Sequence, residues 1–401
     1  MRHSFLPKVC SMMEGKRKIL LLGAGTQGLA IIGNLHKAGY CIEILVEEKG
    51  NYADVSKYIY KRHLHNDSVD SKGFLLQVKK LVSEEEIDVL LPMGDVYAEF
   101  LSKNKEELGK LSNFTAPEYE CFLKGYDKNE LMTLCKRKKY PHPQTIDMTL
   151  CKDLFEDDLK SFPFPAMLKP NCTTGGRGMI KINSYEELLE KYPSLHSVYG
   201  EYHLQRFIPA GGRQIKIQLC VDEKGELINK SALHKVRWYP VKGGASSCSV
   251  SIKEEKMTEI CSQILKDIKW NGFADFDLIE DPDTKELLIM EINPRLPACI
   301  GAAIRAGMDW GQIMVDQALG NDQKTYSYQE GVVLRHLGFD MLWFIKSPLR
   351  FRSIPSWFRF FGSNVYYQDF HLFDQKPFWV GTVQNIKKLM NPSFRKSKQG
   401  A

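Results

Sequence analysis

Residues 287–295 read LLIMEINPR, an apolar run that ends in acidic, amide and basic side chains. The preceding stretch, residues 272–279, is also strand-like, and the turn sequence DPDT lies between the two. Two such runs around a turn predict a β-hairpin. Because side chains alternate along a strand, Glu291 and Asn293 are predicted on one face, with Asp277 opposite Glu291 on the neighbouring strand.

These three oxygen-bearing side chains predict a metal site. The carboxylates of Asp277 and Glu291 and the amide of Asn293 form a ligand set for Mg²⁺ bound together with substrate phosphates, and Mn²⁺ is a possible substitute. Arg295 follows two residues later and can meet a phosphoryl group in transfer. An exposed acidic hairpin is the alternative, but the apolar run 287–290 that enters it argues against that interpretation.

Outward from the hairpin, the N-terminal residues predict a parallel sheet. Strand-like and helix-like runs follow one another at 17–22, 29–38, 41–46 and 87–91. Strands that are apolar on both faces and alternate with helices are typical of an open α/β domain. We expect this domain over residues 16–112, after a loose extension of residues 1–15.

A glycine motif, Gly23-x-Gly25-x-x-Gly28, follows the first of these strands. This spacing lets a helix N-terminus approach a phosphate, and Glu47 stands near the place of a ribose-binding acid. One hypothesis is therefore an NAD-dependent oxidoreductase. The other interpretation, which we favour, is that the glycines only permit a tight turn and close helix packing.

The central region is predicted to be α+β. Asp127 is the N-cap of a helix that runs to about Lys139, with Glu130 completing a capping box. Strand-like runs follow at 166–169, 179–182, 202–208, 214–221 and 227–233, with a capped helix at 184–192.

A second glycine motif, TTGGRG at residues 173–178, lies between two of these strands. It lacks the Lys-Ser/Thr pair and the following helix of a Walker loop, so we expect a hairpin lid. Its bare backbone amides can cradle phosphate oxygens, and Lys169 just before it adds a positive charge. A plain glycine-rich hairpin is the alternative.

Five ordered motifs together resemble those of ATP-grasp enzymes, most closely the carbamoyl-phosphate-synthase-like branch. They are Asp127-Lys128, residues 167–170 (MLKP), residues 175–178 (GGRG), residues 205–209 (QRFIP) and residues 290–295 (MEINPR). The resemblance covers about residues 16–325. It implies an N-terminal Rossmann-like preATP-grasp domain, then a two-subdomain ATP-grasp fold over residues 113–328 whose mobile lid subdomain spans about 128–205.

The resemblance also implies roles for the matching residues. ATP would contact Lys128, Lys169, Thr174, Gly175, Gly176, Gly178, Gln205, Phe207 and Ile208; Asp277, Glu291 and Asn293 would hold the metal; and Arg295 and Arg237 would be catalytic. Arg295 matches the arginine near the reacting phosphate, whereas Arg237 lies in a segment similar to the loop that faces the acceptor and would hold a carboxylate. Arg206 departs from the family, whose members commonly carry an acid there. The family's N-terminal domain usually binds no dinucleotide.

The activity implied is that of an ATP-dependent carboxylate-amine ligase. ATP and Mg²⁺ would activate a small-molecule carboxylate as an acyl phosphate, which an amine attacks to give an amide, ADP and phosphate. Two alternatives stay open: a nucleotide-binding regulatory or scaffold protein without turnover, and the oxidoreductase.

Composition and charge limit the partners and the cellular compartment that we expect for the protein. A net charge of +6 over 401 residues is too mild to imply nucleic acid as the main partner. Ten scattered cysteines and no apolar run of membrane-span length predict a cytoplasmic protein without a zinc site, and a homodimer is possible. Residues 329–401 form an aromatic and basic tail, for which a packed C-terminal subdomain is favoured over a membrane-surface or partner element.

Overall fold

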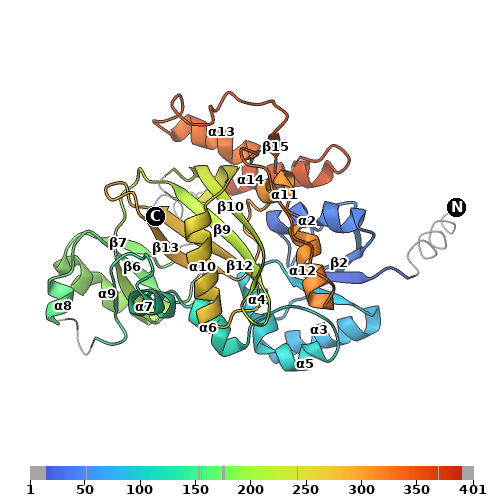
Figure 1. The fold of residues 1–401 in the computed structure, drawn as a ribbon, viewed down its shortest axis with the longest axis horizontal. Helices are drawn as coiled ribbons and strands as arrows, with labels where there is room; N and C mark the ends of the chain where they lie inside the picture. The colour runs from blue at the N-terminus through green and yellow to red at the C-terminus, as the bar shows by residue number, and fades with distance from the viewer. Residues whose placement is uncertain are drawn as a thin grey trace.

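The computed structural model describes residues 15–50, 52–151, 154, 156–173, 177–241, 243–368 and 370–390. Three β-sheets with helices around them confirm a mixed α/β fold. The N-terminal parallel sheet lies at one end of the molecule and a small antiparallel sheet at the other, with a large sheet between them (Figure 1).

The N-terminal sheet has four parallel strands in the order β3-β2-β1-β4. They are β1 (Lys18–Leu22), β2 (Cys41–Val46), β3 (Ile59–Leu64) and β4 (Val89–Pro92), with helices α2 (Thr26–Lys37), α3 (Lys72–Glu85), α4 (Asp95–Lys103) and α5 (Lys105–Gly109). Alternate residues of β1 belong to two different apolar cores, one on each face of the sheet. This burial on both faces explains the continuous apolar runs in the sequence.

The small sheet is antiparallel, in the order β5-β8-β6-β7. Its strands are β5 (Thr145–Asp147), β6 (Ala166–Pro170), β7 (Ile180–Ile182) and β8 (Tyr202–Arg206), with helices α8 (Asp157–Lys160) and α9 (Tyr185–Tyr199). The preceding helices α6 (Tyr119–Tyr126) and α7 (Lys128–Lys138) pack instead in the core of the large sheet. The predicted caps are confirmed, since Asp127 accepts hydrogen bonds from the first turn of α7 and Ser184 from that of α9.

The large sheet has seven strands in the order β13-β12-β9-β10-β11-β14-β15. They are β9 (Gln214–Val221), β10 (Leu227–Tyr239), β11 (Ala245–Ile252), β12 (Gly272–Glu280), β13 (Leu287–Asn293), β14 (Val333–Arg335) and β15 (Val365–Tyr367); the helices are α10 (Glu255–Asp267), α11 (Gly301–Ala306) and α12 (Trp310–Leu319). Only the β14–β15 pair is parallel. Sequence patterns missed β11 because its alternating serines are polar, yet Ser247, Ser249 and Ser251 are buried.

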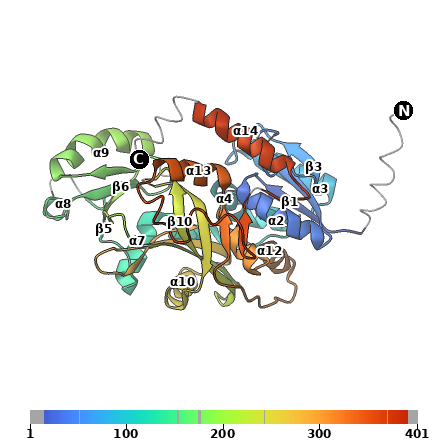
Figure 2. The same ribbon diagram turned by 90° about the horizontal axis from the view of Figure 1, so that it is seen from above.

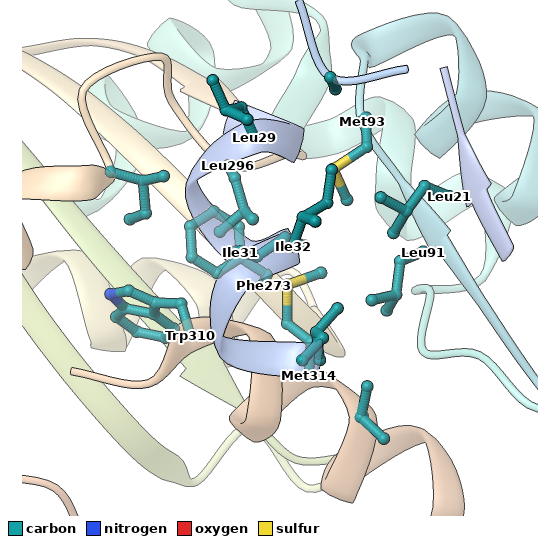
Figure 3. Packing of buried hydrophobic residues seen from close by; sticks show 14 of the residues in the cluster. Leu21, Leu29, Ile31, Ile32, Leu91, Met93, Phe273, Leu296, Trp310 and Met314 are labelled. Atoms are coloured by element: carbon teal, nitrogen blue, oxygen red, sulfur yellow. The ribbon is translucent and has the colours of Figure 1, made fainter. Parts of the chain in front are cut away.

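The N-terminal sheet and the large sheet share one apolar core. Leu29 and Ile31 of α2 pack with Phe273 of β12 and with Trp310 and Met314 of α12 (Figure 3). The relative position of the two sheets is therefore fixed by buried side chains rather than by a linker.

The C-terminal segment packs against both of these regions. Helix α13 (Leu337–Lys346) contacts β10 and β11, whereas α14 (Lys376–Met390) lies along the N-terminal sheet region (Figure 2). Asp374, just before α14, accepts hydrogen bonds from Ser56 and from the backbone of Lys57. Across the described residues, no helix combines the length and apolar character needed to cross a membrane.

Candidate active site

The β12–β13 hairpin carries the three predicted metal ligands. Asp277 lies opposite Glu291 in the register, and Asp275 lies opposite Asn293. The predicted pairing of Asp277 with Glu291 is therefore confirmed. Asp275, which no sequence motif singled out, joins the same face.

A β-bulge at Met290 determines which side chains face the site. Asp277 pairs with Glu291, but the next residue, Leu278, pairs with Ile289, so Met290 has no partner in the ladder. In a regular strand Ile289 and Glu291 would share one face. The bulge instead lets Ile289 join the apolar core while Glu291 points to the opposite side, beside Asp277.

Two lysines bind the carboxylates of the hairpin. Lys216 of β9 lies between Asp275 and Asp277, with Nζ–Oδ distances of 2.8 and 2.7 Å. Lys128, the first residue of α7, has its Nζ 3.4 Å from Glu291 Oε2. Positive charge therefore surrounds these acids on two sides.

Burial and charge act differently on the two aspartates. Burial raises the pKa of Asp275 to about 6, although Lys216 opposes the shift. Burial also opposes the charge on Asp277, but Lys216 and Lys235 outweigh it and lower that pKa to about 2. Asp277 is thus anionic at neutral pH, whereas Asp275 needs Lys216 and the amide of Gln218, 2.8 Å away, to carry its charge.

Lys169 and Lys128 form the opposite wall, from the side of the small sheet. Lys169 on β6 is 6% exposed and donates to the Gln205 side chain on β8. Lys128 donates to the carbonyl of Thr173 over 2.9 Å. Burial lowers the pKa of Lys169 to about 8; Glu291 opposes this shift and Lys128 adds to it. Among the described residues Lys169 forms no ion pair, and a buried cation held by an amide is suited to an anionic ligand.

The hairpin fits a magnesium ion held jointly with phosphates. The side chains of Asp277 and Glu291 are 26% and 33% exposed, so both carboxylates are open to a ligand. The Asn293 amide nitrogen lies 3.2 Å from Asp277 Oδ2. In the ranges that the structure describes, no cluster of three or more His, Cys, Asp and Glu is arranged to hold a metal. Two carboxylates nevertheless suffice for Mg²⁺ when phosphates and water complete its shell.

Arg295 connects this hairpin to the N-terminal sheet. Its Nε lies 3.2 Å from Asp95 Oδ1, at the first residue of α4, and its guanidinium also reaches Asn293 Oδ1 at 3.4 Å. Asp95 follows the carboxyl end of β4, so the parallel sheet orients this arginine toward the predicted metal ligands.

The expected nucleotide-binding residues are only partly described. Phe207 and Ile208 follow directly on β8, and Lys181 on β7 lies over the Phe207 ring at 4.3 Å. Gly178 has a left-handed backbone with φ of 74°, and a Cβ there would meet Pro170 and Tyr199 at 2.9 Å, so only glycine fits. Thr174, Gly175 and Gly176 lie outside the described residues.

Arg206 forms an ion pair that joins the small and large sheets. Its guanidinium lies 2.7 Å from Asp281, in the turn between β12 and β13. Arg206, which replaces the acid expected at this position, thus has an ion-pair partner in this fold.

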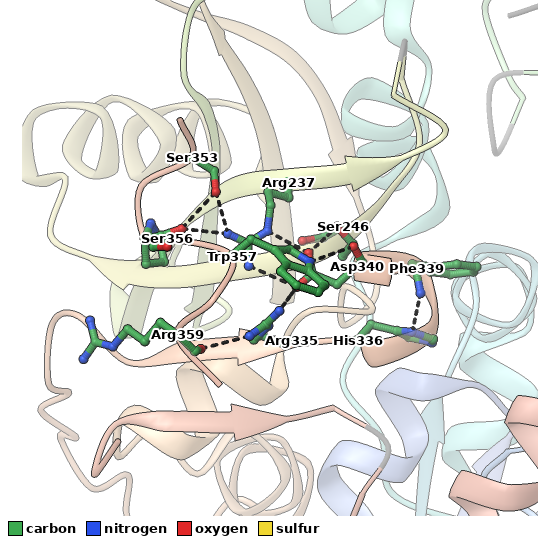
Figure 4. Close-up of polar contacts among 12 residues, drawn as sticks. Arg237, Ser246, Arg335, His336, Phe339, Asp340, Ser353, Ser356, Trp357 and Arg359 are labelled. Atoms are coloured by element: carbon green, nitrogen blue, oxygen red, sulfur yellow. Dashed lines mark hydrogen bonds and ion pairs between the residues drawn. The ribbon is translucent and has the colours of Figure 1, made fainter. Parts of the chain in front are cut away.

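Arg237 is not placed to hold a substrate carboxylate. It is 1% exposed, and its Nε and Nη2 donate to the two oxygens of Asp340 at 2.7 and 3.0 Å (Figure 4). Its Nη1 donates to the carbonyl of Pro355 over 2.8 Å. The carboxylate that this arginine holds is therefore internal, and the expectation of a catalytic role for Arg237 is wrong on this geometry.

The first glycine motif serves packing. A Cβ on Gly23, which has φ of 90°, would lie 2.5 Å from the Tyr97 ring, and one on Gly28 would touch Ala53 and Met93. The side chains of the domain itself thus fill the space beside these glycines, as the favoured interpretation expects. The dinucleotide-binding hypothesis gains no support here.

Three polar residues of the site were missed by sequence patterns: Lys216, Asp275 and Lys235. Burial lowers the pKa of Lys235 on β10, with Asp277 opposing the shift. The signal in the sequence is weak but present, because Lys216 and Gln218 alternate with apolar residues in the strand sequence QIKIQLCV. Polar residues at every second position of a central strand indicate a face turned to a site.

Comparisons with known proteins agree with this geometry. Residues 127–322 match the family model of the carbamoyl-phosphate synthase L chain, ATP binding domain. A D-aspartate ligase of Enterococcus faecium is 26% identical over 223 residues, 52% of this chain and 53% of the relative. A carbamoyl phosphate synthase large chain of Clostridium acetobutylicum is 21% identical over 308 residues, 72% of this chain and 29% of the relative. The chain thus spans about half of the first relative and under a third of the second.

Solved structures share the fold at low identity. The biotin carboxylase domain of the Hydrogenobacter thermophilus 2-oxoglutarate carboxylase, crystallised with MgADP, ADP and bicarbonate, has a TM-score of 0.65 at 17% identity, covering 79% of this chain and 73% of that one. The N5-carboxyaminoimidazole synthetase of Staphylococcus aureus, in complex with ADP, has a TM-score of 0.62 at 14% identity, covering 79% and 81%. Residues 127–322 therefore carry a domain of the family described as the carbamoyl-phosphate synthase L chain, ATP binding domain.

Proposed function

We propose that the protein is an ATP-dependent carboxylate-amine ligase, which forms a C–N bond and releases ADP and phosphate. The observation that carries this proposal is the Asp277–Glu291 pair facing two buried lysines, Lys128 and Lys169. A paired-carboxylate metal site opposite phosphate-binding cations is what phosphoryl transfer from MgATP needs. The D-aspartate ligase and carbamoyl phosphate synthase relatives support the same class of reaction.

Each side chain of the site has a role in this proposal. Lys128 and Lys169 bind the ATP phosphates, and Asp277 and Glu291 hold Mg²⁺ with Asn293 beside them. The metal, when bound, neutralises charge on the phosphates. Phosphoryl transfer needs positioning and charge stabilisation more than covalent help from the protein.

Other side chains act on the transferring group and the adenine. Arg295, oriented by Asp95, stabilises the phosphoryl group as it moves to the substrate carboxylate. Phe207 and Ile208 lie beside the adenine. Lys216 and Lys235 line the floor of the site, where cations can orient an anionic substrate.

The domain roles follow from the same proposal. Residues 16–112 act as the preATP-grasp domain, residues 113–328 as the ATP-grasp domain, and residues 128–205 as its lid subdomain. The core shared by α2 and α12 supports a rigid first domain. By contrast, the small sheet has an apolar core of its own, which lets it move as a body over ATP, whereas α7 at the start of this range packs in the core of the large sheet.

An ADP-release screen tests the activity. The full chain, with MgATP, is assayed against a matrix of small carboxylates and amines, and mass spectrometry identifies any amide formed. Release of ADP that requires both a carboxylate and an amine supports the ligase. Tight MgATP binding without ADP release over the whole matrix would instead favour the regulatory or scaffold alternative.

The pH dependence of nucleotide binding reports on Lys169. Its pKa of about 8 is below the ordinary lysine value, so the cation loses its proton as the pH rises through 8. ATP prefers the protonated form, and we expect the affinity for MgATP to fall about tenfold between pH 7 and pH 9. Calorimetric titration of the wild type and of Lys169→Arg, which stays charged, measures this. An equal decline in both proteins would contradict the assignment.

Asp95→Asn tests how Arg295 is oriented. Loss of the carboxylate charge leaves the guanidinium without its partner in the N-terminal sheet, and we expect kcat to fall about ten- to a hundredfold with little change in KM for ATP. Asp88→Asn, at an exposed pair with Arg17, is the matched control and should leave kcat unchanged. An equal loss in both variants would indicate a general effect on the sheet.

A further inference from the structure

The positive charge of the chain is concentrated in its last 61 residues. Residues 341–401 contain 10 Lys and Arg against 2 Asp, whereas the whole chain has 55 Lys and Arg against 49 Asp and Glu. The remainder, residues 1–340, thus has 45 basic and 47 acidic residues and a net charge of −2. The net charge of +6 is therefore the sum of a basic C-terminal segment and a slightly acidic remainder of the chain.

The same segment exposes large apolar side chains. Helix α13 and the loop after it present Ile345, Leu349, Phe351, Ile354, Phe358 and Phe361, which are 57% to 89% exposed. We call these six residues, with the four cations Lys346, Arg350, Arg352 and Arg359, the 345–361 face. Singly exposed apolar residues are ordinary on a protein surface, but a cluster of this kind marks an interaction site.

The aromatic members of the face lie in contact with one another. The rings of Phe351 and Phe358 stack at 6.3 Å, and both meet Phe344, at 5.6 and 5.7 Å. Arg350 lies over the Phe351 ring at 5.7 Å. Phe351 and Phe358 therefore form one aromatic patch with Arg350 at its side.

The inner side of the segment is firmly anchored. Phe344 stacks on Trp357 at 4.0 Å, and Trp357 is buried and donates to the carbonyl of Asp340. Arg237 binds both Asp340 and the carbonyl of Pro355, whose neighbour Ile354 is 88% exposed (Figure 4). The exposed apolar side chains thus project from a loop whose inner side is packed. This loop lies at the upper edge of the view in Figure 1.

The cations of the face pair with none of the acids that the structure describes. Among the described residues, none of Lys346, Arg350, Arg352 and Arg359 forms an ion pair; Arg350 and Arg359 donate to Ile345 O and to the Asn364 side chain. An isologous contact with a second copy would place these cations against the same cations, which is repulsive. Nucleic acid would satisfy the charge but leave Leu349 and Ile354 without an apolar environment. A partner that is both anionic and apolar fits this surface.

We propose that the 345–361 face docks the protein on an anionic lipid surface. The phenylalanines and isoleucines enter the acyl boundary, while the lysine and arginines bind lipid phosphates at the headgroup level. Helix α13 then lies in the plane of the interface, and the protein stays peripheral to the membrane.

Vesicle sedimentation with the full chain tests this proposal. We expect association with vesicles of phosphatidylglycerol mixed into phosphatidylcholine, weak association with pure phosphatidylcholine, and a decline as salt is raised. Arg350→Gln/Arg352→Gln should lower the partition coefficient about thirtyfold, since each cation near the surface contributes roughly fivefold. Phe358→Ser/Phe361→Ser should lower it at least about tenfold through lost apolar contact.

Matched controls carry the same changes elsewhere on the surface. Lys224→Gln/Lys256→Gln removes two exposed cations, and Leu76→Ser/Val198→Ser removes two exposed apolar residues. Both controls should sediment like the wild type, and all variants should keep its thermal unfolding midpoint. Absence of lipid association in the wild type, or an equal loss in the controls, would overturn the proposal. So would a dimer without vesicle binding that Phe358→Ser/Phe361→Ser dissociates.

Discussion

Glu291→Gln is expected to lower kcat by roughly a thousandfold, the largest effect on activity that the structure predicts. The substitution keeps the volume and hydrogen-bonding reach of the side chain but removes one of the two charges that face each other across the hairpin. It also removes the partner of Lys128. The side chain is partly exposed, so the free energy of unfolding should change little.

The measurement is steady-state ADP release at saturating ATP, with a titration of Mg²⁺ at each enzyme. The variant should also need more Mg²⁺ for half-maximal rate. Glu286→Gln, an exposed change in the turn of the same hairpin, is the control and should behave like the wild type. Near-normal kcat in Glu291→Gln at ordinary Mg²⁺ would remove the metal assignment.

Lys216→Met is expected to have the largest effect on stability, a loss of about 3–5 kcal/mol in the free energy of unfolding. Methionine has a similar length, but it leaves the buried Asp275 and the half-buried Asp277 without the cation that lies 2.8 and 2.7 Å from them. Chemical denaturation at pH 7 measures the loss. Asp275→Asn in the same background should recover part of it, because one uncompensated charge is then absent.

The loss should also depend on pH in a defined direction. Without Lys216 the folded-state pKa values of both aspartates rise above their unfolded values, so the folded variant binds more protons than the unfolded chain and becomes less stable as the pH rises. The difference between the variant and the wild type should therefore shrink between pH 7 and pH 5. A difference below about 1 kcal/mol, or one that does not change with pH, would show that the carboxylates are compensated elsewhere.

The parts of the site that the sequence could predict depend on local pattern. The pairing of Asp277 with Glu291 follows from two strand-like runs and a turn, and the cap of α7 at Asp127 follows from its neighbours. Both features are decided within about twenty residues of chain, where alternation and capping chemistry are strong.

The parts that could not be predicted depend on distant partners. Lys216 and Asp275 are 59 residues apart, and Arg237 and Asp340 are 103 apart. A charged residue in a strand indicates a polar face but not which partner occupies it. For this reason Arg237 appeared available to bind a substrate carboxylate. In the structure its guanidinium binds Asp340 of α13 instead.

The bulge at Met290 has a consequence for how this hairpin can vary. Up to Ile289, β13 reads in one phase, with odd-numbered residues in the core; from Glu291 onward the odd-numbered residues face the site. Met290 therefore shifts the alternation of the strand by one residue, between the part that packs in the core and the part that carries the site residues. Deleting it would restore regular alternation, in which Ile289 still faces the core, Glu291 and Asn293 still face the site, and Asp277 still lies opposite Glu291. When relatives are aligned here, a one-residue gap at Met290 therefore keeps both faces of the strand in phase, whereas a one-residue gap elsewhere inside β13 would turn core residues toward the site.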